Sequence, residues 1–127
     1  MKFTQQSQVG ANLIQRYGAD YVVIGDREIR ESCIVSAATF SSWAPRSVEE
    51  LSTEHLAAIF ALEPEVVVLA TGATQKFPRA ALRAEFATRR IGLEVMEIGA
   101  GCRTYNVLVG EERRVLAAIL LPGTAHP

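Results

Sequence analysis

The segment Val66-Val67-Val68-Leu69-Ala70 contains five consecutive apolar residues, three of them valine, and Thr71-Gly72 follows it directly. Such a run is too short for a buried helix and is typical of an interior strand that is covered on both faces. Before it, Leu56, Ile59 and Phe60 have the i, i+3, i+4 spacing of an amphipathic helix. A helix next to a fully buried strand indicates an α/β domain.

Strand and helix signals alternate on both sides of this run. A Gly25-Asp26 turn signal between two β-branched runs predicts a β-hairpin over residues 21–36. Beyond the hairpin we expect a loop at 39–46, a helix capped at Ser47 or Ser52 and ended by Pro64, the strand 66–70, a helix at 79–90, a strand at 93–98, a helix at about 100–110 and a strand at 115–121.

The order of these elements predicts a single three-layer α/β domain over residues 1–127, with a mixed, mostly parallel sheet and an N-terminal β-hairpin. Residues 1–18 are mostly polar with isolated apolar positions, so we expect a less regular arm there. Residues 123–127 are expected to form a loose tail. No internal repeat or linker divides the chain.

Composition excludes several classes of function. The 127 residues carry 13 basic and 14 acidic side chains, a formal net charge of -1, which opposes a nucleic-acid partner. No apolar run approaches the roughly 18 residues that span a bilayer, so no direct membrane insertion is expected. The amino terminus lacks the apolar core of a secretory signal, which predicts a cytoplasmic location. Cys33 and Cys102 have neither zinc-site nor disulfide spacing, and we expect no metal and no cofactor.

The first candidate site is the loop after the central strand, where open α/β sheets bind ligands. Backbone N–H groups at the next helix start and the polar side chains of this loop could receive an anion; the residues concerned are Thr71, Gly72, Thr74 and Lys76. A loop with one glycine is neither a P-loop nor a dinucleotide fingerprint. An ordinary strand-to-helix turn is the alternative reading.

The second candidate site is the segment Gly99–Asn106, at the next predicted strand-to-helix junction. Cys102 in a first helical turn beside Arg103 would favour a thiolate. The residues placed here are Cys102, Arg103, Thr104, Tyr105 and Asn106. The two histidines, His55 and His126, offer this thiol no obvious general base. A buried cysteine that packs as a small hydrophobe is the alternative, with Gly101 serving close helix–sheet packing.

Both candidate loops follow strands that could be neighbours, so we expect the two helix starts to meet at one rim of the sheet. A separate candidate is Trp43, in a proline-containing loop, which could anchor a protein partner because aromatic residues are enriched at interfaces. An exposed sheet edge would also allow such a domain to pair as a homodimer.

Three segments of the chain resemble a known family: residues 64–72 with Phe77-Pro78, residues 92–97, and residues 100–108. This is a family of small α/β proteins with a domain of unknown function, and it includes the mitochondrial respiratory complex I assembly factor three. The resemblance covers residues 21–122, and the Cys-X-Thr-aromatic-Asn order at 102–106 is its most specific part. It implies a single three-layer domain, a protein partner and little about activity. Ala70 replaces a glycine that is frequent in the family, and Gly101 replaces an alanine. We take the chain to be bacterial.

Two functions are therefore compared. The favoured one is a non-catalytic binding or assembly module, similar to respiratory complex I assembly factors, that holds an unknown protein partner. The alternative is an enzyme or small-molecule binder whose anionic ligand lies between the loop Thr71–Lys76 and the helix start at Cys102.

Overall fold

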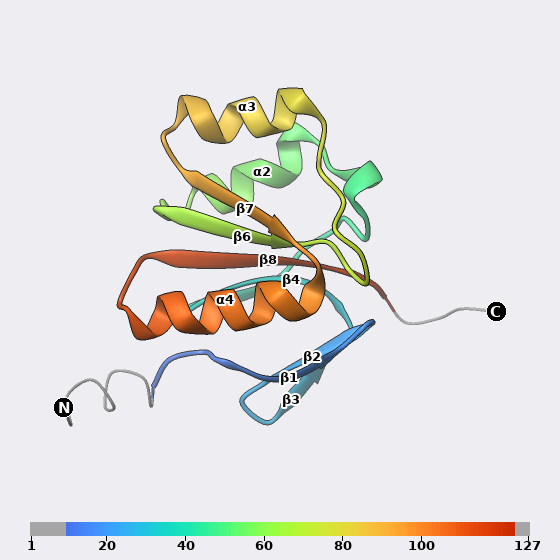
Figure 1. Cartoon of the computed structure of the whole chain (residues 1–127), viewed down its shortest axis with the longest axis vertical. Coiled ribbons are helices and arrows are strands. Elements are labelled where there is room, and N and C mark those ends of the chain that lie inside the picture. Colours follow the sequence, from blue (N-terminus) through green and yellow to red (C-terminus); the bar gives the residue numbers. More distant parts are fainter. Residues whose placement is uncertain (1–9, 124–127) are drawn as a thin grey trace.

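Residues 10–123 are described by the computed structural model of the chain, which contains two sheets, three α-helices and one 3-10 helix (Figure 1). The elements in chain order are β1 (Ile14–Gly18), β2 (Tyr21–Ile24), β3 (Arg27–Ile29), β4 (Glu31–Ser36), β5 (Phe40–Ser42), η1 (Val48–Glu50), α2 (Thr53–Phe60), β6 (Val66–Ala70), α3 (Ala80–Thr88), β7 (Gly92–Met96), α4 (Ile98–Gly110) and β8 (Val115–Pro122).

The larger sheet has five strands in the order β5-β4-β8-β6-β7. β6 pairs in parallel with both β7 and β8, while β4 pairs antiparallel with β8 and β5. All five residues of β6 are buried, because the strand has a neighbour on each side and a layer on each face. The α/β class with a mixed sheet is thus confirmed, with the central strand at the residues expected from its apolar run.

Two layers cover this sheet, one on each face, which makes three layers in all. Helices α2 and α3 cover one face, where Leu56, Ile59, Leu82 and Phe86 pack against β6 and β8 (Figure 1). Helix α4 and the three-stranded sheet β1-β2-β3 cover the other face. Two separate hydrophobic cores result, one on each side of the five strands.

The predicted N-terminal hairpin is divided between the two sheets. Gly25, at φ +64°, allows the two-residue turn that joins β2 to β3. After Ile29 the chain leaves the small sheet, and β4 joins the large one beside β8. Apolar patterning does not mark this division, because Ile29 at the end of β3 is apolar like the run that forms β4.

Other boundaries also differ from the expectation. Residues 14–18 of the expected irregular arm form β1, which pairs with β2, whereas residues 1–9 lie outside the described residues. The expected loop at 39–46 contains the short edge strand β5. Ser47 precedes the 3-10 helix η1, and α2 begins after Ser52, whose N–H donates to His55 Nδ1 at 3.2 Å. Beyond Gly123, the expected tail also falls outside the described residues.

Gly101 sets the distance between α4 and β6. A Cβ placed on this buried glycine would lie 3.0 Å from Ala70 Cβ and 3.5 Å from Val68 Cγ1. A methyl group at position 101 would press against Ala70 and force a shift of a few tenths of an ångström, so glycine favours the close approach of α4 to β6.

Replacing Gly101 with valine should lower the free energy of unfolding by about 1–3 kcal/mol, because the added methyl groups force α4 away from β6. Urea denaturation followed by circular dichroism measures this change. Ala100→Val, on the half-buried side of the same helix, is the matched control and should cost less. Equal unfolding midpoints for the two variants would contradict the close packing at Gly101.

Candidate functional site at the start of α4

The two loops singled out in the sequence lie together at one rim of the large sheet. Thr71 N donates to Met96 O at 2.9 Å, and Ile98 N donates to Gly72 O at 2.8 Å. Gln75 Nε2 adds a bond to Val95 O at 2.8 Å. The loop after β6 is thus tied to the junction between β7 and α4, as the parallel order of these strands requires.

The Thr71 hydroxyl closes its own loop. Its Oγ1 donates to Thr74 O at 2.7 Å and accepts from Lys76 N at 3.0 Å. Gly72 has φ +95°, a conformation that suits glycine. The side chains of Thr74 and Lys76 are exposed. Of the residues placed in this loop as ligand groups, Thr71 therefore holds the turn together, while Lys76 faces solvent.

Glu97 occupies the N-terminus of α4, where an anion was expected. Its carboxylate oxygens accept from Gly99 N and Ala100 N, each at 2.7 Å. These hydrogen bonds lower the pKa of Glu97, the one from Ala100 more than the one from Gly99, so the side chain is held in its charged form. A side chain of this chain thus supplies the negative charge that the helix N-terminus favours.

Cys102 does not have the environment of a reactive thiol. Helix α4 begins at Ile98, which puts Cys102 in its second turn, and the side chain is 2% exposed. Burial raises the pKa of Cys102 to about 12, with a further increase from Glu97, and the nearby Arg103 does not offset this. Desolvation outweighs the helix dipole, which is worth only about 0.3–1 kcal/mol. Of the two readings of this residue, the structure therefore opposes the thiolate and agrees with the buried cysteine.

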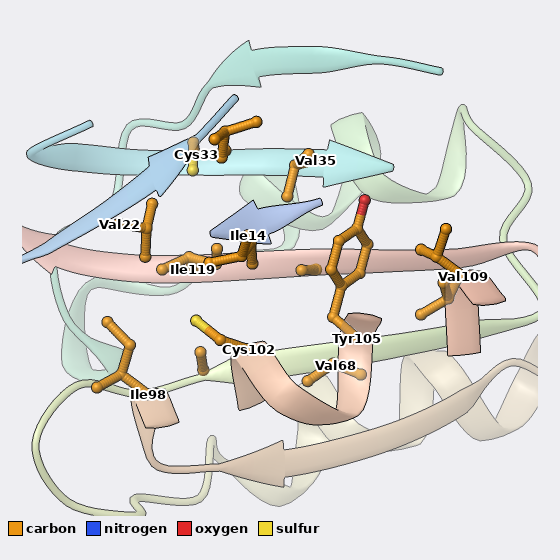
Figure 2. Packing of buried hydrophobic residues seen from close by; sticks show 14 of the residues in the cluster. Ile14, Val22, Cys33, Val35, Val68, Ile98, Cys102, Tyr105, Val109 and Ile119 are labelled. Carbon is orange, nitrogen blue, oxygen red and sulfur yellow. The ribbon is translucent and has the colours of Figure 1, made fainter. Parts of the chain in front are cut away.

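Cys33 projects into the same core from β4 (Figure 2). Its side chain is fully buried, and burial raises its pKa to about 12. Both cysteines are free thiols. The packing alternative raised for Cys102, a small hydrophobe inside the core, describes both residues.

The polar residues after Cys102 bind the N-terminal part of the chain. Asn106 Oδ1 accepts from Ile14 N, and Asn106 Nδ2 donates to Ile14 O, both at 2.9 Å. The fully buried Tyr105 donates from its hydroxyl to Asn12 O at 2.6 Å, and burial raises its pKa. Three bonds therefore connect α4 to the backbone at residues 12–14.

Arg103 also binds the N-terminal sheet, at the far end of β1. Its Nη1 donates to the Tyr17 hydroxyl at 2.5 Å. Thr104 lies half-buried on the same helix. We call Arg103, Tyr105 and Asn106 the α4 clamp. Its role in holding the N-terminal sheet was not foreseen from the sequence, since nothing in the spacing of these residues points to β1.

Trp43 belongs to the opposite core. It is 7% exposed, and its Nε1 donates to His55 O at 3.1 Å. One edge of it lines a pocket of about 460 Å3 with Glu31, Ser42 and Arg46. This pocket lies at the carboxyl end of β8, near Leu121 and Gly123. Trp43 can therefore contact a partner only through this pocket, without protruding as an anchor.

Residues 10–123 contain no group of three or more histidine, cysteine, aspartate or glutamate side chains placed to hold a metal ion. No helix among them has the length and apolar composition to cross a membrane.

The fold and the α4 clamp define an α/β protein in which one helix joins a mixed sheet to an N-terminal sheet. The chain belongs to the family described as "Protein of unknown function (DUF498/DUF598)", which matches residues 14–120. The resemblance inferred from the 102–106 segment is thereby confirmed.

Similar proteins include NADH dehydrogenase (ubiquinone) 1 alpha subcomplex assembly factor 3 of Danio rerio. It is 30% identical over 120 residues, which are 93% of this chain and 69% of that protein. The 13 kDa major membrane protein of Francisella tularensis is 24% identical over 123 residues, 94% of this chain and 100% of that one. The solution structure of a Xanthomonas campestris protein matches with a TM-score of 0.83 and 34% identity, covering 90% of this chain and 87% of that chain.

Substituting Asn106 with alanine should release β1 from α4. The change leaves the Ile14 N–H and C=O without their partner, which should cost about 1–3 kcal/mol of stability. Hydrogen exchange should become faster at the Ile14 amide, and urea denaturation should report the loss of stability. Val107→Ala, at an exposed neighbouring position, is the control. An unchanged Ile14 exchange rate in Asn106→Ala would contradict the clamp.

The buried thiols predict a loss of stability at alkaline pH. The folded pKa of Cys33 and of Cys102 is about 12, above the value near 8.5 of an exposed thiol. The folded state therefore keeps its protons longer, so stability is full below about pH 8.5 and falls as the pH rises towards 12. Urea denaturation between pH 7 and 10.5 should show this decline, with a smaller slope in Cys102→Ala. An equal slope in both proteins would contradict the burial of this thiol.

Proposed function

We propose that this chain is a non-catalytic protein-binding module that takes part in the assembly of a larger protein complex. The observation that supports this function most directly is the α4 clamp. The polar side chains of Arg103, Tyr105 and Asn106 bind the chain's own backbone and Tyr17, so they build a scaffold instead of facing a substrate.

The names of the relatives also support an assembly function. Assembly factor 3 of Danio rerio is named for the assembly of an NADH dehydrogenase subcomplex, and 93% of this chain aligns with it. A role in respiratory-complex assembly for this chain is part of the proposal. It assigns no nucleic-acid partner, because the net charge is -1.

A small anionic ligand between Thr71–Lys76 and the start of α4 is the weaker alternative. The Glu97 carboxylate already binds two N–H groups of that helix start, and Cys102 is buried with its pKa raised to about 12. A ligand there would have to displace Glu97 or bind outside it, through the exposed Lys76 and Arg103.

We also propose that the chain comes from a bacterium and acts in the cytoplasm. Free cysteines at both positions agree with a reducing compartment. The name of the Francisella tularensis relative, a major membrane protein, favours a location at the membrane instead. Cell fractionation would decide between the two locations. We further propose that the chain forms a homodimer through a sheet edge, which light scattering would test.

Affinity capture with the full chain as bait, followed by reconstitution from purified components, tests the assembly function. We expect at least one protein to co-migrate with the chain in a fixed stoichiometry during size-exclusion chromatography. Asn106→Ala, which should loosen the scaffold, is expected to weaken that complex more than Val107→Ala does. Trp43→Ala is a poor probe, because it removes a core side chain.

A different set of results would contradict the assembly function. Absence of a stoichiometric partner, together with a thermal shift from a panel of anionic metabolites, would favour the small-molecule alternative. Loss of that shift in Lys76→Ala or Arg103→Ala would place the ligand at the predicted junction.

A further inference from the structure

The edge strand β5 presents backbone hydrogen-bonding groups away from its sheet. Trp43 N donates to Ser32 O, and Ser36 N donates to Thr39 O, both at 2.9 Å. Residues of an antiparallel strand alternate in the direction of their N–H and C=O groups. Since Thr39 and Trp43 face β4, the intervening alternate residues Phe40 and Ser42 direct their backbone groups outward.

A groove runs beside this edge. A cavity of about 370 Å3 lies between residues 27–31 and the strand residues Phe40 and Ser42. It adjoins the 460 Å3 pocket of Trp43 and Arg46, because Glu31 and Ser42 line both. Phe40 and Ser42, which direct their backbone groups outward, line these neighbouring cavities, and we call the two together the β5 groove.

The other edge of the large sheet is partly closed. Gly92 N donates to Glu65 O, and Thr71 N donates to Met96 O, so alternate residues of β7 face β6 and Val95 faces outward. Gln75 Nε2 donates to Val95 O at 2.8 Å and occupies that outward carbonyl. At the β5 edge, by contrast, the outward backbone groups adjoin the cavities lined by Phe40 and Ser42.

Two guanidinium groups mark the ends of the β5 groove. Arg27 lies over the Phe40 ring at 4.6 Å, and the Arg46 side chain lies beside Gly123. The ion pairs found within residues 10–123 involve neither of them. Glu50 accepts the backbone N–H of Arg46, and Arg30 is paired with Asp20 and Glu28.

The charge of the middle of the groove is different. Glu31 is exposed and lines both cavities, so it disfavours a carboxylate at that point and can accept a hydrogen bond. An occupant that matches these charges carries acidic groups at its ends and a neutral or basic centre.

We propose that the β5 groove binds an extended segment of a partner protein, which adds to the sheet as a strand beside β5 and places acidic side chains against Arg27 and Arg46. This inference rests on the proposed protein-binding function and names its mode. Backbone bonds to Phe40 and Ser42 supply affinity, and the two arginines supply selectivity, as in other cases of strand addition.

A phage-displayed library of random twelve-residue peptides, selected on the full chain, provides the probe. We expect enriched peptides with a β-branched centre and acidic ends. In hydrogen exchange by NMR, a synthetic enriched peptide should slow the amides of Phe40 and Ser42, and should leave Ser41, whose N–H faces β4, unchanged.

Ser42→Pro removes one outward N–H without removing a bond to β4, because proline is tolerated where an edge N–H faces solvent. We expect at least a tenfold loss of peptide affinity in this variant. Ser42→Ala keeps the N–H and should bind as the wild type does. Arg46→Glu should weaken peptides with acidic ends about tenfold.

Several results would overturn this inference. They are a selection without enriched peptides, equal binding by Ser42→Pro and the wild type, or protection of amides outside β5. Protection of Phe40 and Ser42 that grows with protein concentration alone would assign the edge to a second copy of the chain. A captured partner that binds Ser42→Pro normally would exclude the β5 groove and leave the assembly function in place.

Discussion

Two hydrogen bonds between the Asn106 side chain and the backbone of Ile14 fix the N-terminal sheet to helix α4, which packs on the large sheet. The amide acts as a short substitute for a neighbouring strand, because it donates to a carbonyl and accepts from an N–H of the same residue. Around it, Ile14, Val22 and Ile24 pack with Cys102 and Tyr105 in one core (Figure 2). The N-terminal sheet thereby becomes the cover of α4.

This arrangement determines which chemistry the surface can offer. The face of α4 that carries Cys102 and Tyr105 is buried, and the helix N-terminus binds Glu97, so the start of α4 is an internal joint. Within residues 10–123, backbone groups that face away from the sheet lie on β5, and Arg27 and Arg46 take part in none of the ion pairs. A surface of this kind suits recognition of another polypeptide better than conversion of a small molecule.

The sequence predicted those parts of the fold whose signals are local. The valine run of β6, the Ser52 cap of α2 and the apolar run of β8 each determine their element without help from distant residues. β1 could not be recognised, because only Ile14 among its five residues is buried and its partners lie on β2 and α4. Glutamate is a poor N-cap by residue type, so the hydrogen bonds from the N–H groups of Gly99 and Ala100 to Glu97 could not be predicted from the sequence. For the thiol at position 102 the sequence left two readings open, a thiolate and a buried core residue, because dipole and charge act along the sequence, whereas burial depends on β4 and β1.

The separation of 92 residues between Ile14 and Asn106 has a consequence during synthesis on the ribosome. Strands β1, β2 and β3 can pair as soon as they emerge, since their contacts are local, but the helix that covers their apolar side is translated much later. Until then Val22 and Ile24 remain open to chaperones and to misassociation. Slow translation between β3 and α4 would prolong that exposure, so the yield of folded protein depends on the elongation rate across the middle of the chain.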